Sequence, residues 1–75
     1  MSDYTIKFSD VNSVNRFVDI VKKFDCPMDL EQGRYKVNAK SVMGIFSLDI
    51  VKPIVLHVYS DDSTDLYNLI SEFIV

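Results

Sequence analysis

The chain has 75 residues, of which 48% are hydrophobic and 25% are charged, and its formal net charge at pH 7 is −3. This length predicts one domain spanning residues 1–75, and the composition is typical of a folded globular protein. The acidic balance argues against nucleic acid and anionic lipid as partners, because both bind basic surfaces.

The cellular location is indicated by two features of the sequence. There is a single cysteine, Cys26, so no internal disulfide can form, which fits a reducing compartment. The first residues, MSDYTIKF, lack the basic and apolar regions of a signal peptide, and no apolar run is long enough to cross a membrane. We therefore expect a cytoplasmic protein.

The first two elements follow from a change in the spacing of apolar residues. Tyr4, Ile6 and Phe8 alternate with polar residues, which predicts a half-buried strand. Ser9 and Asp10 come next, and both are good helix N-caps. Spacings of three and four then predict an amphipathic helix whose buried face carries Val11, Val14, Phe17, Val18, Val21 and Phe24.

The middle of the chain predicts a β-hairpin. The segment Asp25-Cys26-Pro27 should end the helix, because proline disfavours a helical conformation of the residue before it. Met28 and Leu30 alternate with acidic residues, and a second alternating run covers residues 35–39. Between these strands, Gln32-Gly33 predicts a turn in which the glycine has a positive φ.

Three more elements complete the chain. Residues 41–46 predict a short helix, and the alternation over residues 54–58 predicts a fourth strand. Residues 60–63 should cap a last helix, whose buried face is expected to carry Leu66, Leu69, Ile70, Phe73 and Ile74.

The element order is therefore β-α-β-β-α-β-α. Right-handed crossovers then favour one four-stranded antiparallel sheet with all three helices on one face, an open-faced sandwich of the α+β class. The other face should be mostly polar and solvated. Its residues would be Thr5, Lys7, Asp29, Glu31, Arg34, Lys36, Asn38, Val55, His57 and Tyr59.

The most informative segment is residues 37–48, which read Val-Asn-Ala-Lys-Ser-Val-Met-Gly-Ile-Phe-Ser-Leu. With its place between the third and fourth strands, this segment resembles the HPr family. These are the small phosphocarrier proteins of the bacterial phosphoenolpyruvate-dependent sugar phosphotransferase system. The resemblance covers nearly the whole chain, and it implies an HPr-like open-faced β-sandwich.

The short helix at residues 41–46 carries the candidate binding residues. Ser41 stands where a strand gives way to a helix, so its hydroxyl can cap the first turn and contribute about 1 kcal/mol. Gly44 costs about 1 kcal/mol in helix propensity, which favours a close backbone approach as its reason. So short a helix cannot bury its whole circumference, and an exposed apolar patch marks a partner surface.

The resemblance adds two expectations about this helix. It implies that proteins bind there, through Val42, Met43, Ile45, Phe46 and Ser47, and that Ser41 is a site of regulatory phosphorylation. A phosphate is chemically acceptable at a helix N-terminus, where unpaired N–H groups and the positive end of the helix dipole face it. The alternative that Ser41 is only an N-cap stays open.

The start of the first helix departs from the family. The family carries its phosphoryl group on a histidine there, followed by an arginine, whereas residues 8–16 contain no histidine. Counted back from Lys40-Ser41, the histidine position falls on Asp10 and the arginine position on Asn12. We expect Asp10 to cap the helix and to place negative charge where a phosphoryl group would lie.

The remaining polar residues predict no catalytic or metal site. His57 is the only histidine, it falls in the middle of a strand, and we expect it to be solvated. No motif supplies it with a catalytic partner, so we do not expect an enzyme. A lone histidine and a lone cysteine cannot build a metal site, and we expect neither metal nor cofactor.

Three hypotheses follow. The first is a regulatory HPr-like protein without phosphohistidine transfer, which binds proteins such as an HPr serine kinase or a transcriptional regulator, as in carbon catabolite regulation. The second is a working phosphocarrier with another acceptor, namely Asp10, Ser9 or His57. The third is a plain interaction module unrelated to sugar transport. In each case we expect a monomer or a weak dimer.

Overall fold

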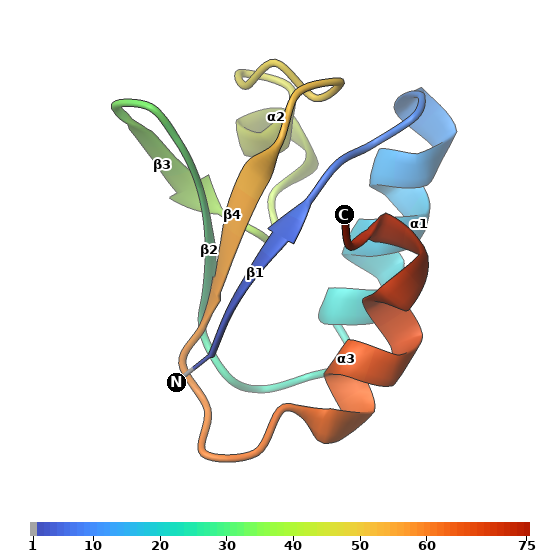
Figure 1. Cartoon of the computed structure of the whole chain (residues 1–75), viewed down its shortest axis with the longest axis vertical. Helices are drawn as coiled ribbons and strands as arrows, with labels where there is room; N and C mark the ends of the chain where they lie inside the picture. Colours follow the sequence, from blue (N-terminus) through green and yellow to red (C-terminus); the bar gives the residue numbers. More distant parts are fainter. Residues whose placement is uncertain (1) are drawn as a thin grey trace.

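The structure is a computed structural model that describes residues 2–75, and its elements follow the predicted order (Figure 1). The strands and helices are β1 (Ser2–Ile6), α1 (Val11–Val21), β2 (Met28–Gln32), β3 (Tyr35–Asn38), α2 (Val42–Ile45), β4 (Ile54–Val58) and α3 (Thr64–Ile70), with a 3₁₀ turn η1 (Ser71–Phe73) after α3.

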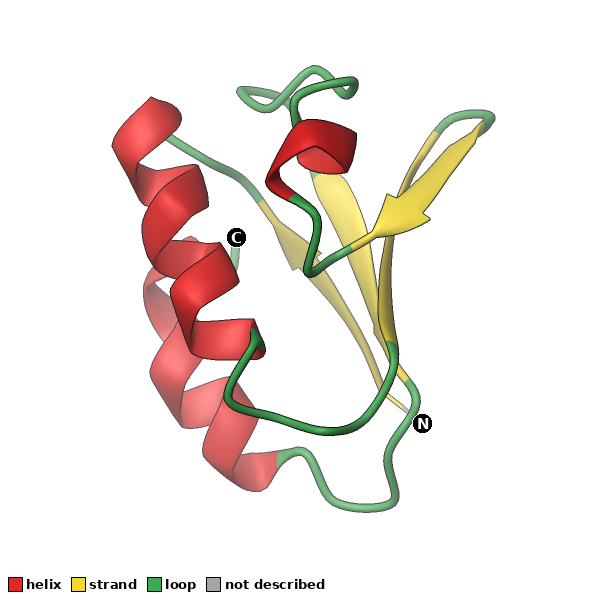
Figure 2. Ribbon diagram, turned by 180° about the vertical axis from the view of Figure 1, so that it is seen from behind, coloured by secondary structure: helices red, strands yellow, loops and turns green. Residues whose placement is uncertain are grey.

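The four strands form one sheet in the order β1-β4-β2-β3, and every neighbouring pair is antiparallel. Figure 2 shows all three helices on the same side of this sheet. The predicted α+β open-faced sandwich is therefore confirmed. The hairpin between β2 and β3 is confirmed as well, since Gly33 lies in its turn with a φ of 59°.

The core lies between the sheet and the helices. Three phenylalanine rings fix one end of it: Phe8 contacts Phe17 with ring centroids 5.3 Å apart, and Phe73 lies 5.5 Å from Phe17. Phe8 lies beyond the end of β1 but is 1% exposed. These contacts join residues from before α1, within α1 and after α3, so the two long helices are packed against each other and the sheet.

The C-terminal residues cover one edge of the sheet. Ile74 forms a bridge with Ile6, and the amide of Val75 donates to the carbonyl of Thr5 at 3.0 Å. The outer edge of β1 is thereby partly paired, while β3 forms the other edge. Within residues 2–75 no helix has the length and apolar character required to span a bilayer.

Two residues predicted to lie on buried helix faces are exposed, so these predictions were wrong. Val11 is 56% exposed because it is the first residue of α1 and lies past the edge of the core, where Ser13 is buried instead. Leu69 is 49% exposed because the buried face of α3 is formed by Leu66 and Ile70, and Leu69 lies outside that face.

The helix ends also differ in detail from the predictions. α1 ends at Val21, and the amides of Lys23 and Phe24 bond three residues back, as in a tightened last turn. At α3 the N-cap Ser63 makes no capping bond with its side chain, which bonds the hydroxyl of Tyr4 at 2.7 Å. The carboxylate of Asp62 accepts from the Thr64 amide instead, which lowers the pKa of Asp62.

Candidate functional site

The start of α1 is closed by a reciprocal set of hydrogen bonds. The carboxylate of Asp10 accepts from the backbone amide of Ser13 at 2.8 Å. The Ser13 hydroxyl accepts from the Asp10 amide at 3.2 Å and donates to the Asp10 carbonyl at 2.7 Å. This is a capping box, and it confirms Asp10 as the N-cap of α1. A negative charge thus lies at the positive end of the helix.

The start of α2 has a simpler and neutral cap. The Ser41 hydroxyl accepts from the amide of Gly44 at 3.1 Å, which confirms the predicted capping role. A Cβ atom on Gly44 would lie 3.3 Å from both the Ser41 hydroxyl oxygen and the Cβ of Val37. The close approach expected at Gly44 is confirmed, since α2 lies directly on β3 there.

The connection that leads into α2 is tied to the loop that follows α1. The ammonium of Lys40 donates to the carbonyl of Phe24 at 2.5 Å, and Lys40 is only partly exposed. The Lys40 amide also donates to the side chain of Asn38 at 2.8 Å. The Lys-Ser pair of the sequence motif therefore has two structural roles, because Lys40 joins two loops and Ser41 caps a helix.

Four of the five residues predicted to bind partners lie at the surface. Met43 is 87% exposed, Phe46 is 41% exposed, Val42 is half-buried and Ser47 is exposed. Ile45 is 0% exposed and belongs to the core, so it cannot contact a partner. A four-residue helix must have an inner side, and Ile45 is the residue on it.

Two further exposed apolar residues, which the sequence analysis missed, belong to segments that neighbour this helix. They are Val51, 52% exposed in the loop after α2, and Val11, 56% exposed at the start of α1. Figure 1 places the start of α1, the helix α2 and the loop after it at the same end of the molecule. The Phe8 amide donates to the Ile50 carbonyl at 3.1 Å and so joins the two segments.

We call the resulting patch the α1–α2 surface; it comprises Val11, Val42, Met43, Phe46, Ser47 and Val51. Large apolar side chains gathered at one end of a small protein are a common mark of a protein-binding site. Val51 could have been recognised in the sequence as a valine in a predicted loop, because an apolar side chain in a loop need not be buried.

His57 is not the freely solvated residue that the sequence suggested. Its side chain is 19% exposed, with Nδ1 2.8 Å from an Asp3 carboxylate oxygen and Nε2 2.7 Å from a Glu31 carboxylate oxygen. These hydrogen bonds, first with Asp3 and then with Glu31, raise the pKa of His57 above its ordinary value. The partners come from β1 and β2, so only strand pairing reveals them.

This arrangement limits what His57 can do. A neutral imidazole has one N–H and can donate to only one carboxylate, whereas the imidazolium donates to both. Both ring nitrogens face carboxylate oxygens, which favours the protonated and non-nucleophilic form. Within residues 2–75 there is no group of three or more side chains placed to hold a metal ion.

Solved structures with a similar fold define the class of this protein. The chain superposes on a structure described as HPr-C-His from Thermoanaerobacter tengcongensis with a TM-score of 0.80 and 28% identity, covering 99% of this chain and 91% of the other. It also matches a phosphocarrier protein HPr from Bacillus anthracis str. Ames with a TM-score of 0.77 and 25% identity, covering 96% and 95% of the two chains.

The sequence comparison agrees with the structural one. The family described as "PTS HPr component phosphorylation site" matches residues 11–74, which is most of the chain. The chain belongs to the HPr family of the phosphotransferase system. The members of this family are phosphocarrier proteins rather than enzymes, and they interact with other proteins.

Proposed function

We propose that this chain is a protein-binding, regulatory member of the HPr family that does not transfer a phosphoryl group from histidine. The observation that carries the proposal is the closed start of α1. The Asp10 carboxylate, 2.8 Å from the Ser13 amide, occupies the helix end at which the family resemblance places the phosphoacceptor histidine. The charge that a phosphoryl group would bring is already supplied by a side chain.

Electrostatics argue against the alternative acceptors. A phosphate arriving at Asp10 would meet a like charge, and the Ser13 amide that could bind it is already paired. A phosphate arriving at His57 would meet two carboxylates within 2.8 Å of the ring nitrogens. Ser9 is exposed, and its neighbour in the chain is the carboxylate of Asp10. The residues therefore favour action by contact.

The α1–α2 surface is the proposed docking site. Met43 and Phe46 supply its most exposed large side chains, and Val11 and Val51 extend it to the neighbouring segments. Burying such side chains in a complex is favourable by about 25 cal/mol per Å² of apolar surface. We infer that the partner is a protein that recognises this end of the molecule.

Ser41 is the proposed point of control. Ser41 is half-buried, and its hydroxyl accepts one hydrogen bond, from the Gly44 amide. A phosphate on this oxygen keeps acceptor oxygens at the helix start and adds a charge of about −1.5 to −2 beside Met43. The added charge changes the docking surface without removing any core side chain, since Ile45 carries the packing of α2.

The proposal is tested by labelling with two phosphoryl donors. Incubation with an HPr serine kinase and ATP should add one phosphoryl group, observed by intact-mass spectrometry. Ser41→Ala should stay unlabelled, whereas Ser47→Ala should be labelled like the parent protein, because Ser47 lies in the same exposed segment. Incubation with phosphoenolpyruvate and the first enzyme of the phosphotransferase system should add nothing, with a histidine-bearing HPr as the positive control.

Each other outcome has a definite meaning. Acid-labile phosphate after incubation with phosphoenolpyruvate would contradict the proposal and support a phosphocarrier with another acceptor. A protein that neither enzyme modifies would contradict regulation through Ser41 and leave a plain interaction module. Labelling that persists in Ser41→Ala would place the modification at another residue.

A further inference from the structure

A pocket lies between the tip of the β2–β3 hairpin and the loop that leads into β4, next to Val51 of the α1–α2 surface. Its volume is about 440 Å³, within the range of roughly 300–1,000 Å³ that is common for small-molecule sites. The pocket is shallow and largely open to solvent, and it is lined by Gln32, Gly33, Arg34, Tyr35, Asp49, Lys52 and Pro53.

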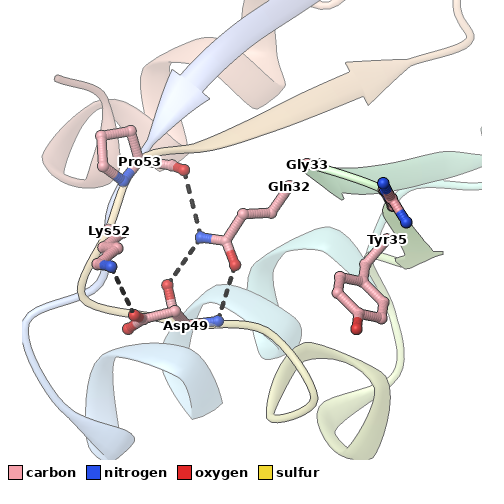
Figure 3. Close-up of a pocket in the computed structure, with 7 residues that line it drawn as sticks. Gln32, Gly33, Tyr35, Asp49, Lys52 and Pro53 are labelled. Carbon is pink, nitrogen blue, oxygen red and sulfur yellow. Dashed lines mark hydrogen bonds and ion pairs between the residues drawn. The ribbon is translucent and has the colours of Figure 1, made fainter.

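The two walls of the pocket are joined by the side-chain amide of Gln32. Its Oε1 accepts from the Asp49 amide at 2.8 Å, and its Nε2 donates to the Asp49 carbonyl at 2.9 Å. The same Nε2 lies 3.4 Å from the Pro53 carbonyl. Figure 3 shows Gln32 reaching across to this loop. The hairpin and the loop are therefore held at a set distance, and the pocket exists before any ligand binds.

The walls present flat and cationic groups. Figure 3 shows Tyr35 and Pro53 on opposite sides of Gln32, and Tyr35 is 66% exposed, so its ring is available to stack on a ligand. Among residues 2–75 the guanidinium of Arg34 makes no ion pair. Lys52 lies 3.5 Å from its one carboxylate partner, Asp49, and its side chain is 72% exposed.

The charge at this pocket is opposite to that of the whole protein. Two cations and one carboxylate line it, whereas the chain carries a net charge of −3. Because Asp49 is paired with Lys52, the charge left for a ligand is that of Arg34. A guanidinium recognises carboxylate and phosphate groups with paired hydrogen bonds and also stacks on aromatic rings.

We propose that this pocket binds a small organic anion with a flat ring. The ring packs against Tyr35, and the carboxylate or phosphate group of the ligand is held by Arg34. The site does not depend on the proposed function, because none of its residues belongs to the α1–α2 surface. It would give the protein a metabolite-binding site beside the loop that follows α2.

NMR titrations of the ¹⁵N-labelled protein test this site with four probes. Phenyl phosphate and benzoate should produce saturable shifts at the amides of Gly33, Asp49 and Lys52. Inorganic phosphate should bind about tenfold more weakly than phenyl phosphate, since it lacks the ring, and neutral benzyl alcohol should also bind about tenfold more weakly, since it lacks the charge. Raising the ionic strength to about 1 M should weaken binding of both aromatic anions.

Matched variants assign the effect to the pocket. Arg34→Gln and Tyr35→Ala should each weaken phenyl phosphate binding about tenfold, and Lys23→Gln, an exposed change outside the pocket, should leave it unchanged. The dispersion of each variant's spectrum shows whether it is folded. The proposal is wrong if neither aromatic anion gives saturable shifts at these amides, or if Lys23→Gln loses as much affinity as Arg34→Gln. Equal binding of benzyl alcohol or inorganic phosphate would also overturn it.

Discussion

The helices α1 and α2 begin in similar ways but are held in place very differently. α1 has 11 residues, and it buries Val14, Phe17, Val18 and Val21. α2 has 4 residues and buries only Ile45. α1 begins with a charged capping box, whereas α2 begins with the neutral hydroxyl of Ser41. The long helix thus builds the core, and the short one presents exposed apolar side chains at the surface.

The largest expected effect concerns the single anchor of α2. Ile45→Ala should lower the free energy of unfolding by about 2–5 kcal/mol, since it removes a fully buried side chain and leaves a cavity. Met43→Ala, two residues away and 87% exposed, should change it by less than about 0.5 kcal/mol. Urea unfolding followed by circular dichroism measures both. Similar losses in the two variants would show that Ile45 is not the anchor.

An intermediate effect is expected from the two caps. Asp10→Ala removes a charged cap with reciprocal bonds and should lower the free energy of unfolding by about 1–2 kcal/mol. Ser41→Ala removes one hydrogen bond from a shorter helix and should lower the free energy of unfolding by about 0.5–1 kcal/mol. The exposed change Asp19→Ala within α1 serves as the control for loss of a carboxylate. A larger loss for Ser41→Ala than for Asp10→Ala would reverse the ranking of the two helix starts.

The smallest expected effect is the pH dependence of stability that arises from the contacts of His57 with Asp3 and Glu31. It distinguishes these carboxylates from that of Asp10, which contacts a backbone amide. The contacts with Asp3 and Glu31 raise the pKa of His57 in the folded state. Their stabilisation is therefore fully present below the unfolded pKa of about 6.5 and is lost as the pH rises through the folded pKa. Because the carboxylates are about half exposed, we expect the free energy of unfolding to fall by only about 0.5–1 kcal/mol as the pH rises.

The measurement is urea unfolding at pH values from about 6 to 9, a range above the titration of ordinary carboxylates. His57→Gln should flatten the pH dependence, whereas Asp10→Ala should lower stability by a similar amount at each pH, since its partner is a backbone amide. Stability of the parent protein that rises with pH over this range would contradict the assigned role of His57.

Much of the fold is predictable from the sequence because its signals are local. The change of apolar spacing predicts each strand and helix, since side chains alternate in a strand and repeat every 3.6 residues in a helix. Local signals also predict the two helix caps, at Asp10 and Ser41, and the turn at Gly33. Each cap joins residues three apart in the chain, and the turn needs only the φ of 59° that glycine allows.

The sequence by itself therefore determined the element order and the two helix caps. Only the tertiary structure decided that Ile45 points inward, and that His57 meets Asp3 and Glu31, which lie 54 and 26 positions away in the chain. The same holds for the pocket built by Gln32 and Asp49, 17 positions apart. Contacts at such separations depend on strand order and register, which the spacing of apolar residues does not specify.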